Sequence, residues 1–156
     1  NFSRLPILAE LARRFPSVKI VVNHLGGKID ARASDDDKSS WRSAVETIAE
    51  CPNVVMKLGG AQMRVGDWEP HFHMNKTRTP QGSNDFINDL MPYYAHAINC
   101  FGPERCMFES NFPVDKECIS YRTLWNFFKK ITNRLGLSDS EKNSVFYECA
   151  RSTYKL

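Results

Sequence analysis

Three short runs of apolar residues alternate with amphipathic helical patterns along this chain, and that alternation constrains the fold more than any other feature. The runs are Val18–Val22, Val54–Leu58 and Cys106–Phe108. Each is short and nearly continuous in apolar side chains, as expected for a strand that is covered on both faces. Strands that alternate with helices of ten or more residues predict βαβ units and a parallel sheet. We therefore predict an α/β fold.

Helical patterns separate these strands and follow the last of them. They run from Ser3 or Arg4 to Phe15, from Ser40 to Glu50, from Ser83 or Asn84 to Phe101, from Leu124 to Leu135, and onward from Ser138, which opens a capping box with Glu141. The three consecutive aspartates at 35–37 are interpreted as a solvated loop. They are not read as a metal site, because adjacent carboxylates do not face one point.

Each strand follows a proline, and the positions eight residues beyond the three prolines are His24, Gly60 and Asn111. If the three units are equivalent, His24 and Asn111 lie at the same height on the carboxyl edge of the sheet, with a glycine leaving space between them. Ligands of α/β folds bind at that edge. A histidine after a strand is either functional or a hydrogen-bonded structural residue, and the matching polar group on the third strand favours function.

The alternation of side chains along a strand predicts which groups share the inner face. It places Val22 on the face of His24 and puts Glu109 of the third strand there too. It turns Lys57 toward the helices, unless the strand bulges or Lys57 lies nearer the edge. An inward Glu109 needs a partner, and Arg105 or a ligand is the candidate.

Composition and charge bound the remaining possibilities. The 156 residues suffice for one domain, residues 1–156, and the net charge of +3 is too small to predict nucleic-acid binding. No apolar run approaches the roughly 20 residues of a membrane span. The five cysteines are widely spaced, so we expect free thiols in a reducing, cytoplasmic setting. The chain begins at Asn1 without methionine, which suggests a piece of a longer protein.

Three motifs and the last residues of the chain resemble a known family. The motifs are the N-H-L-G-G strand end in Val21–Gly27, the K-L-G-G strand end in Val54–Gly60, and F-G-P-E-R-C-M-F-E-S-N-F-P-V-D in Phe101–Asp115. They resemble the amidohydrolase-related branch of predicted TIM-barrel metal-dependent hydrolases, which includes sugar and dicarboxylate lactonases and aminocarboxymuconate-semialdehyde decarboxylase. The resemblance implies the C-terminal portion of a TIM (β/α)₈ barrel, namely its last three βα units plus a terminal helix.

The resemblance also implies where the site lies. The strand-six histidine of the family, a metal or substrate ligand, falls on His24, and the strand-eight aspartate falls on Asn111. Asparagine cannot act as a general base and removes a charge that would help to hold zinc or manganese. Asp115 and Glu109 are the carboxylates that can substitute. Asp115 has an alternative role as the N-cap of the next helix.

The resemblance further implies a hydrolase that opens a lactone or another cyclic ester or amide, with His24, Asn111 and Asp115 as catalytic residues. Four residues of the long irregular segment after the second strand are expected to contact a small-molecule substrate: Arg64, Trp68, His71 and His73. The His71-Phe72-His73 spacing matches the family's H-x-H metal pair, but its position in this segment makes the match a coincidence. The first-strand metal pair of the family is absent from these residues.

Two alternatives remain open from the sequence. One is a decarboxylase on the same scaffold. The other is an inactive, truncated barrel that acts as a structural or partner-binding piece, because an open three-stranded sheet exposes its edges and favours association, including homo-oligomers.

Overall fold

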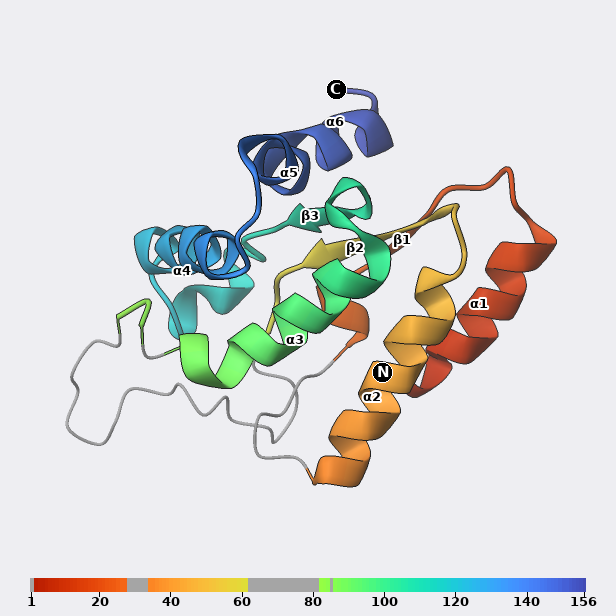
Figure 1. Ribbon diagram of the computed structural model, residues 1–156, viewed down its shortest axis with the longest axis horizontal. Helices are drawn as coiled ribbons and strands as arrows, with labels where there is room; N and C mark the ends of the chain where they lie inside the picture. The colour runs from red at the N-terminus through yellow and green to blue at the C-terminus, as the bar shows by residue number, and fades with distance from the viewer. Residues whose placement is uncertain (1, 28–33, 62–81, 85) are drawn as a thin grey trace.

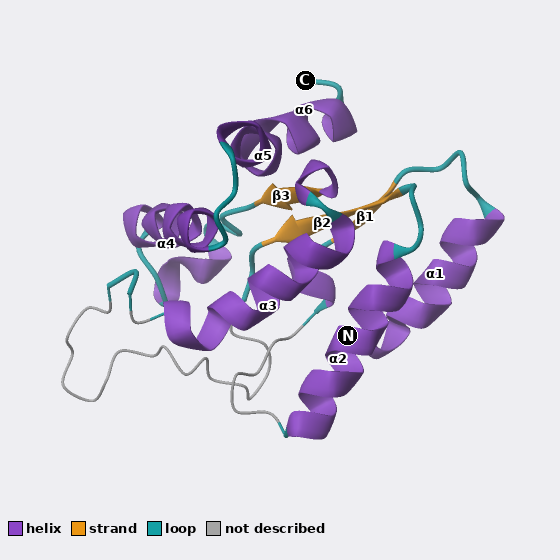
Figure 2. Ribbon diagram, viewed as in Figure 1, coloured by secondary structure: helices purple, strands orange, loops and turns teal. Residues whose placement is uncertain are grey.

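The three predicted strands form one parallel sheet. The computed structural model describes residues 2–27, 34–61, 82–84 and 86–156. Strands β1 (Ile20–Val22), β2 (Val54–Leu58) and β3 (Cys106–Phe108) pair in parallel in the order β1-β2-β3 (Figures 1 and 2). The predicted α/β class and parallel pairing are confirmed. The first strand is shorter than predicted, since it begins at Ile20.

Helices surround this sheet. They are α1 (Leu5–Arg14), α2 (Asp35–Ala49), α3 (Ile87–Phe101), α4 (Tyr121–Arg134), α5 (Asp139–Asn143) and α6 (Cys149–Tyr154), and a π-helical turn (Ser144–Glu148) joins the last two. Short 3₁₀ turns span Phe2–Arg4, His24–Gly26, Pro103–Arg105 and Val114–Glu117. The predicted capping box at Ser138 and Glu141 is present at the start of α5.

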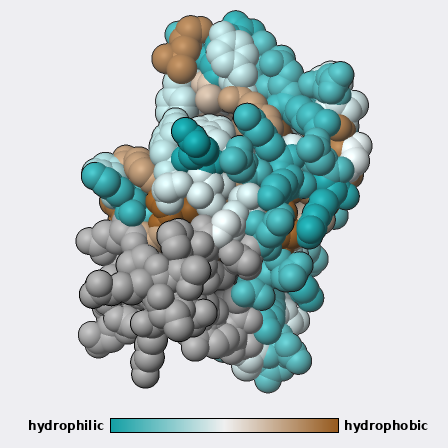
Figure 3. Space-filling view, turned by 90° about the vertical axis from the view of Figure 1, so that its left-hand side faces the viewer, coloured by the Kyte–Doolittle hydropathy of each residue, from teal (hydrophilic) through white to brown (hydrophobic). Residues whose placement is uncertain are grey.

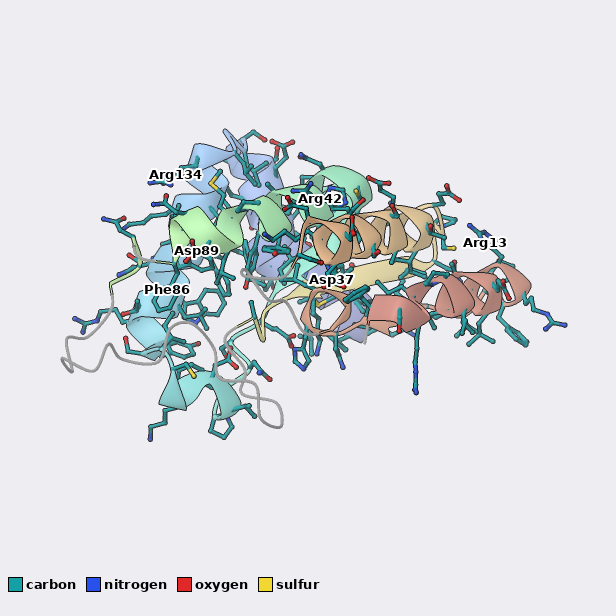
Figure 4. The ribbon with its side chains drawn as sticks, turned by 90° about the horizontal axis from the view of Figure 1, so that it is seen from below. Arg13, Asp37, Arg42, Phe86, Asp89 and Arg134 are labelled. Carbon is teal, nitrogen blue, oxygen red and sulfur yellow. The ribbon has the colours of Figure 1, made fainter. Side chains whose placement is uncertain are left out.

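The second helix starts earlier than the sequence predicted. Ser34 caps α2, because its hydroxyl accepts a hydrogen bond from the Asp37 backbone N–H at 3.1 Å. The three aspartates therefore form the first turn of the helix, where the helix dipole favours negative charge, and Asp37 marks this end in Figure 4. The prediction of a solvated loop at these positions was wrong.

The two faces of the sheet are covered differently. One face carries Val22, Met56 and Phe108 and packs against α1 to α4 in the main hydrophobic core. The other face carries Val55 and Met107, and both pack against Cys149 at the start of α6. In Figure 1 the sheet lies between α3 on one side and the terminal α5–α6 segment on the other. The terminal helical segment thus covers part of the second face.

The predicted faces are confirmed for Glu109, which contacts His24, but were wrong for Val22 and Lys57. Val22 is buried among the outer helices, and Lys57 lies on the second face, where it reaches Glu109. The physical reason is local backbone geometry. Asn23 is still extended, but His24 has a φ of 55°, so the chain leaves the extended conformation at His24 itself. The alternation of the strand therefore cannot be carried forward to the histidine.

The predicted equal register of the three strands was wrong. The ladder pairs Val22 with Met56 and Met56 with Cys106, whereas counting from the prolines would pair Val22 with Leu58; His24 nevertheless lies against Gly60. Strands of a curved sheet are staggered, and equal counting from the prolines ignores that stagger.

The character of the surface is visible on one side of the molecule. On the side shown in Figure 3 it is mainly hydrophilic with small apolar patches. Ile7, Leu11 and Phe15 are exposed at helical spacing and form one stripe along α1, although Phe15 had been predicted on the buried face. Within the described ranges, no helix has both the length and the apolar character needed to cross a membrane.

Candidate functional site

Gly59 and Gly60 directly follow strand β2. Both positions need glycine because two polar residues, His24 and Glu109, approach them closely. A Cβ on Gly60 would lie 2.5 Å from His24 Nδ1, and a Cβ on Gly59 would overlap Glu109 at its backbone oxygen and Cγ. Gly60 also has a φ of 68°, which favours glycine. The prediction that a glycine leaves space for His24 is confirmed, and the pair brings β2 against both neighbouring strand ends.

Glu109 is the centre of a small charged cluster at this edge. Its Oε1 lies 2.7 Å from His24 Nδ1, and its Oε2 lies 3.4 Å from Lys57 Nζ. Burial by itself would raise the pKa of Glu109, but the interactions with His24 and Lys57 outweigh it and lower the pKa. Glu109 is therefore an anion at neutral pH, and it lies in ion-pair contact with one nitrogen of the His24 ring, although the two atoms do not have the geometry of a hydrogen bond.

Lys57 is the member of this cluster that the sequence analysis misplaced. Burial alone would lower its pKa, yet contacts with Tyr154 and Glu109 raise it. The ammonium also lies 5.7 Å from the centre of the Tyr154 ring. A lysine inside an otherwise apolar strand was the signal in the sequence, because such a residue needs an anionic partner on the same face.

Arg105 does not pair with Glu109, contrary to one sequence-based expectation. Its guanidinium donates hydrogen bonds to the carbonyl oxygens of Phe101 at 2.9 Å and Cys51 at 3.0 Å. The side chain therefore ties α3 to the loop before β2, at the opposite end of the strands from the glycine pair.

Asn111 and Asp115 form a second pair. Asn111 Nδ2 donates to Asp115 Oδ1 at 2.7 Å, and Asp115 has no exposed surface. The other carboxylate oxygen, Oδ2, is buried and has no hydrogen-bond partner among the described residues. Burial raises the pKa of Asp115 to about 6; the Asn111 hydrogen bond and the charge of His24 oppose the rise, and the charge of Glu109 adds to it. The two pairs therefore interact electrostatically.

Asp115 is not the cap of the following helix. Ser120 has that position, because its hydroxyl accepts a hydrogen bond from the Thr123 backbone N–H at 3.1 Å. Asp115 lies in the preceding turn, Val114–Glu117. The N-cap interpretation of Asp115 was therefore wrong, and its carboxylate needs another explanation.

Both predicted residues at the strand ends have unusual backbone conformations. His24 has a φ of 55° and Asn111 a φ of 52°, in the left-handed region that non-glycine residues rarely adopt. Such strain persists where the surrounding structure imposes it, and it is concentrated at functional sites.

Tyr94 is a neighbour that sequence reasoning assigned only to a helix face. The ring is fully buried, and within the described ranges its hydroxyl has no hydrogen-bond partner. Burial raises the pKa of Tyr94 well above its ordinary value, and the charges of Asp115 and Glu109 add to this. A protonated phenol is thus kept near both carboxylates. Nothing in the helical pattern distinguishes this tyrosine from a core residue.

The predicted substrate contacts cannot be placed against this site. They lie in residues 62–81, outside the described residues: Arg64, Trp68, His71 and His73. Their role stays a prediction.

The described residues at this edge do not complete a metal centre. If His24 donates its Nδ1 proton to Glu109, its Nε2 is left as a lone pair suited to a metal, as in many metal-binding histidines. However, the one described group of three ligand side chains whose donor atoms all lie within 4.8 Å of one another is found elsewhere, between α2 and α3. A zinc or manganese ion here would need ligands from outside the described residues.

A parallel βα array with its polar groups at the carboxyl edge is the arrangement of (β/α)₈-barrel enzymes, and the chain corresponds to about half of such a barrel. The amidohydrolase family Amidohydro_2 matches residues 2–156, and the chain belongs to this family.

Two curated relatives illustrate the range of the family. The chain is 40% identical over 147 residues to the uncharacterized protein y4mH of Sinorhizobium fredii, covering 94% of this chain and 42% of that protein. It is 26% identical over 155 residues to L-fucono-1,5-lactonase of Burkholderia multivorans, covering 98% of this chain and 48% of the enzyme. The chain spans about half the length of the curated relatives that it matches.

A solved structure agrees with this assignment. An amidohydrolase from Burkholderia multivorans with bound zinc aligns with a TM-score of 0.79 at 25% identity, covering 99% of this chain and 50% of the other. The predicted family and the predicted partial barrel are thus confirmed.

Proposed function

We propose that the protein hydrolyses a lactone or a similar cyclic ester or amide by water attack at the carboxyl edge of the sheet. Membership of the amidohydrolase family and the similarity to a sugar lactonase support this reaction class. The observation that carries the proposal is the environment of Asp115. This carboxylate is buried, Asn111 donates a hydrogen bond to one of its oxygens, and the other has no partner in the part of the chain that the structure describes.

Asp115 is the general base in this proposal. A base works best when its pKa lies near the working pH, and burial raises the pKa of Asp115 to about 6. Asn111 cannot accept a proton, but its amide fixes Oδ1 and so directs Oδ2. Asn111 is therefore a positioning residue, and the base lies four positions later in the chain.

His24 is proposed to meet the substrate carbonyl or to ligate a metal through Nε2. Glu109 fixes the ring at Nδ1, and Lys57 keeps Glu109 ionised. A bound zinc or manganese ion would polarise the carbonyl of the substrate. Decarboxylation on the same scaffold is less well supported, because that reaction has no attacking water for the Asp115 carboxylate to activate.

The proposal is tested by assaying the full-length protein against a panel of sugar lactones that includes L-fucono-1,5-lactone. Asp115→Asn and His24→Ala should each abolish hydrolysis, whereas Asp36→Asn, which changes an exposed aspartate in α2, should not. Thermal melting shows whether each variant folds. Full hydrolysis by the Asp115→Asn protein would remove Asp115 from the mechanism.

A further inference from the structure

A group of side chains between α2 and α3 has no role in the site at the carboxyl edge. Glu46 comes from α2, and His96 and Cys100 are one turn apart on α3. His96 Nε2 lies 3.7 Å from Glu46 Oε1 and 3.6 Å from Cys100 Sγ. Figure 4 shows the two helices side by side, with Arg42 labelled near their contact.

The geometry does not fit a nucleophilic triad. In a Cys-His-acid triad the thiol and the acid use different nitrogens of the imidazole. Here Glu46 and Cys100 both approach Nε2 of His96. Burial raises the pKa of Cys100, and the charge of Glu46 raises it further, so the free thiol is not activated.

Hydrogen bonding does not account for the cluster either. The Nε2 atom of His96 carries at most one proton, and the Arg42 carbonyl oxygen at 3.2 Å is its best acceptor. The contacts with Glu46 and Cys100 are both longer. Two oxygen atoms and one sulfur atom therefore surround one nitrogen, although it can donate to only one of them.

A metal ion explains this convergence. With metal–nitrogen and metal–oxygen bonds of about 2.0–2.2 Å and metal–sulfur bonds of about 2.3 Å, tetrahedral ligand atoms lie roughly 3.3–3.6 Å apart. The two distances to His96 Nε2, 3.7 Å and 3.6 Å, are close to these values. A carboxylate, an imidazole and a thiolate form a set of donors suited to zinc.

We propose that Glu46, His96 and Cys100 bind one divalent transition-metal ion of the zinc type and thereby link α2 to α3. On binding, the Cys100 thiol releases its proton to solvent. Neutral His96 then carries its proton on Nδ1, gives up the hydrogen bond from Nε2 to the Arg42 carbonyl, and supplies the Nε2 lone pair. The ligands then carry two negative charges, which balance the cation. Glu46 is mostly exposed, so the ion can enter from solvent, and a water molecule completes the coordination.

Cobalt(II) provides the direct test on the full-length protein, because a cysteine thiolate bound to Co²⁺ gives a charge-transfer absorption that oxygen and nitrogen ligands do not give. We expect this band in the wild type, its loss in Cys100→Ser, and its retention in Cys118→Ser. Cys118→Ser removes the cysteine nearest in sequence to Asp115. It therefore shows whether the band comes from the α2–α3 site or from a thiol near the carboxyl edge. Absence of the band in the wild type, or its persistence in Cys100→Ser, would overturn the proposal.

A milder variant covers the case in which Cys100→Ser fails to fold. Glu46→Gln changes an exposed side chain and should weaken Co²⁺ binding at least about tenfold. Glu10→Gln, at an exposed position of α1, should leave the affinity unchanged. Zn²⁺ should also raise the melting temperature of the wild type by more than that of His96→Gln, in which only a site at the carboxyl edge could still bind it. Equal affinities in Glu46→Gln and Glu10→Gln would contradict the assigned ligand set.

Discussion

Replacing Gly60 with alanine tests how closely the site is packed, and the chain contains a matched control. Gly60 and Gly136 both have a φ of 68°, but a Cβ on Gly136 would meet nothing within 4 Å. Alanine in this backbone region costs roughly 1–2 kcal/mol at either position. Any difference between the two variants therefore measures the surroundings of Gly60.

Those surroundings are the His24 ring. The new Cβ would lie 2.5 Å from Nδ1 and 2.8 Å from Cγ, whereas favourable contacts lie at about 3.5–4.0 Å. His24 would have to retreat by about 1 Å, which breaks its 2.7 Å contact with Glu109. Overpacking adds about 1–3 kcal/mol to the cost in Gly60→Ala. A displacement of that size at a catalytic group lowers turnover roughly 100-fold.

Urea unfolding and lactone hydrolysis by the full-length protein measure both effects. We expect Gly136→Ala to lose only the stability that alanine costs in this backbone region and to keep its turnover. Gly60→Ala should lose more stability and most of its activity. If both variants lost the same stability and kept the same turnover, the packing of Gly60 against His24 would have no functional meaning.

Three further substitutions test the electrostatics of the site. Because burial raises the pKa of Asp115 from 3.8 to about 6, ionising it in the folded protein costs on the order of 3 kcal/mol, and this cost grows as the pH rises between those values. Asp115→Asn should therefore be more stable than the wild type at pH 8 and lose that advantage near pH 4; lower stability at pH 8 in urea unfolding would refute this. Lys57→Met leaves the Glu109 carboxylate without its ammonium partner and should lower the free energy of unfolding by about 2 kcal/mol at pH 7. Because the pKa of Glu109 in the wild type is lowered, the difference in unfolding free energy between wild type and Lys57→Met should become smaller below pH 4.5. A difference that does not change with pH would argue against the ion pair. Asn111→Asp should tighten divalent-metal binding in titration calorimetry, and unchanged binding would defeat the idea that Asn111 replaces a metal-binding aspartate.

The sequence was sufficient for the fold because the strands are short, apolar and separated by well-marked helices. Val54–Leu58 and Cys106–Phe108 were predicted at their observed bounds. The capping box at Ser138 has a strictly local cause, so it too could be read from the sequence. The start of α2 was missed because Ser34 is as good a cap as Ser40, and the three aspartates between them resembled a loop.

The geometry of the site could be predicted only in part. His24 and Asn111 stand out as polar residues after strands. Both have left-handed backbone conformations, so the alternation of side chains along a strand does not predict which way they point. Lys57 was therefore placed on the wrong face, and Glu109 was given the wrong candidate partner. The raised pKa of Asp115 depends on burial by distant parts of the chain, which no local pattern records.

The pH dependence of lactone hydrolysis by the full-length protein tests most directly whether Asp115 is the base. With a pKa of about 6 for that carboxyl, kcat/KM should rise through this pH region and level off above it, and the rise should disappear together with the activity in Asp115→Asn. A profile that is flat between pH 5 and 7, or an Asp115→Asn protein with the same rise and comparable rates, would contradict the mechanism.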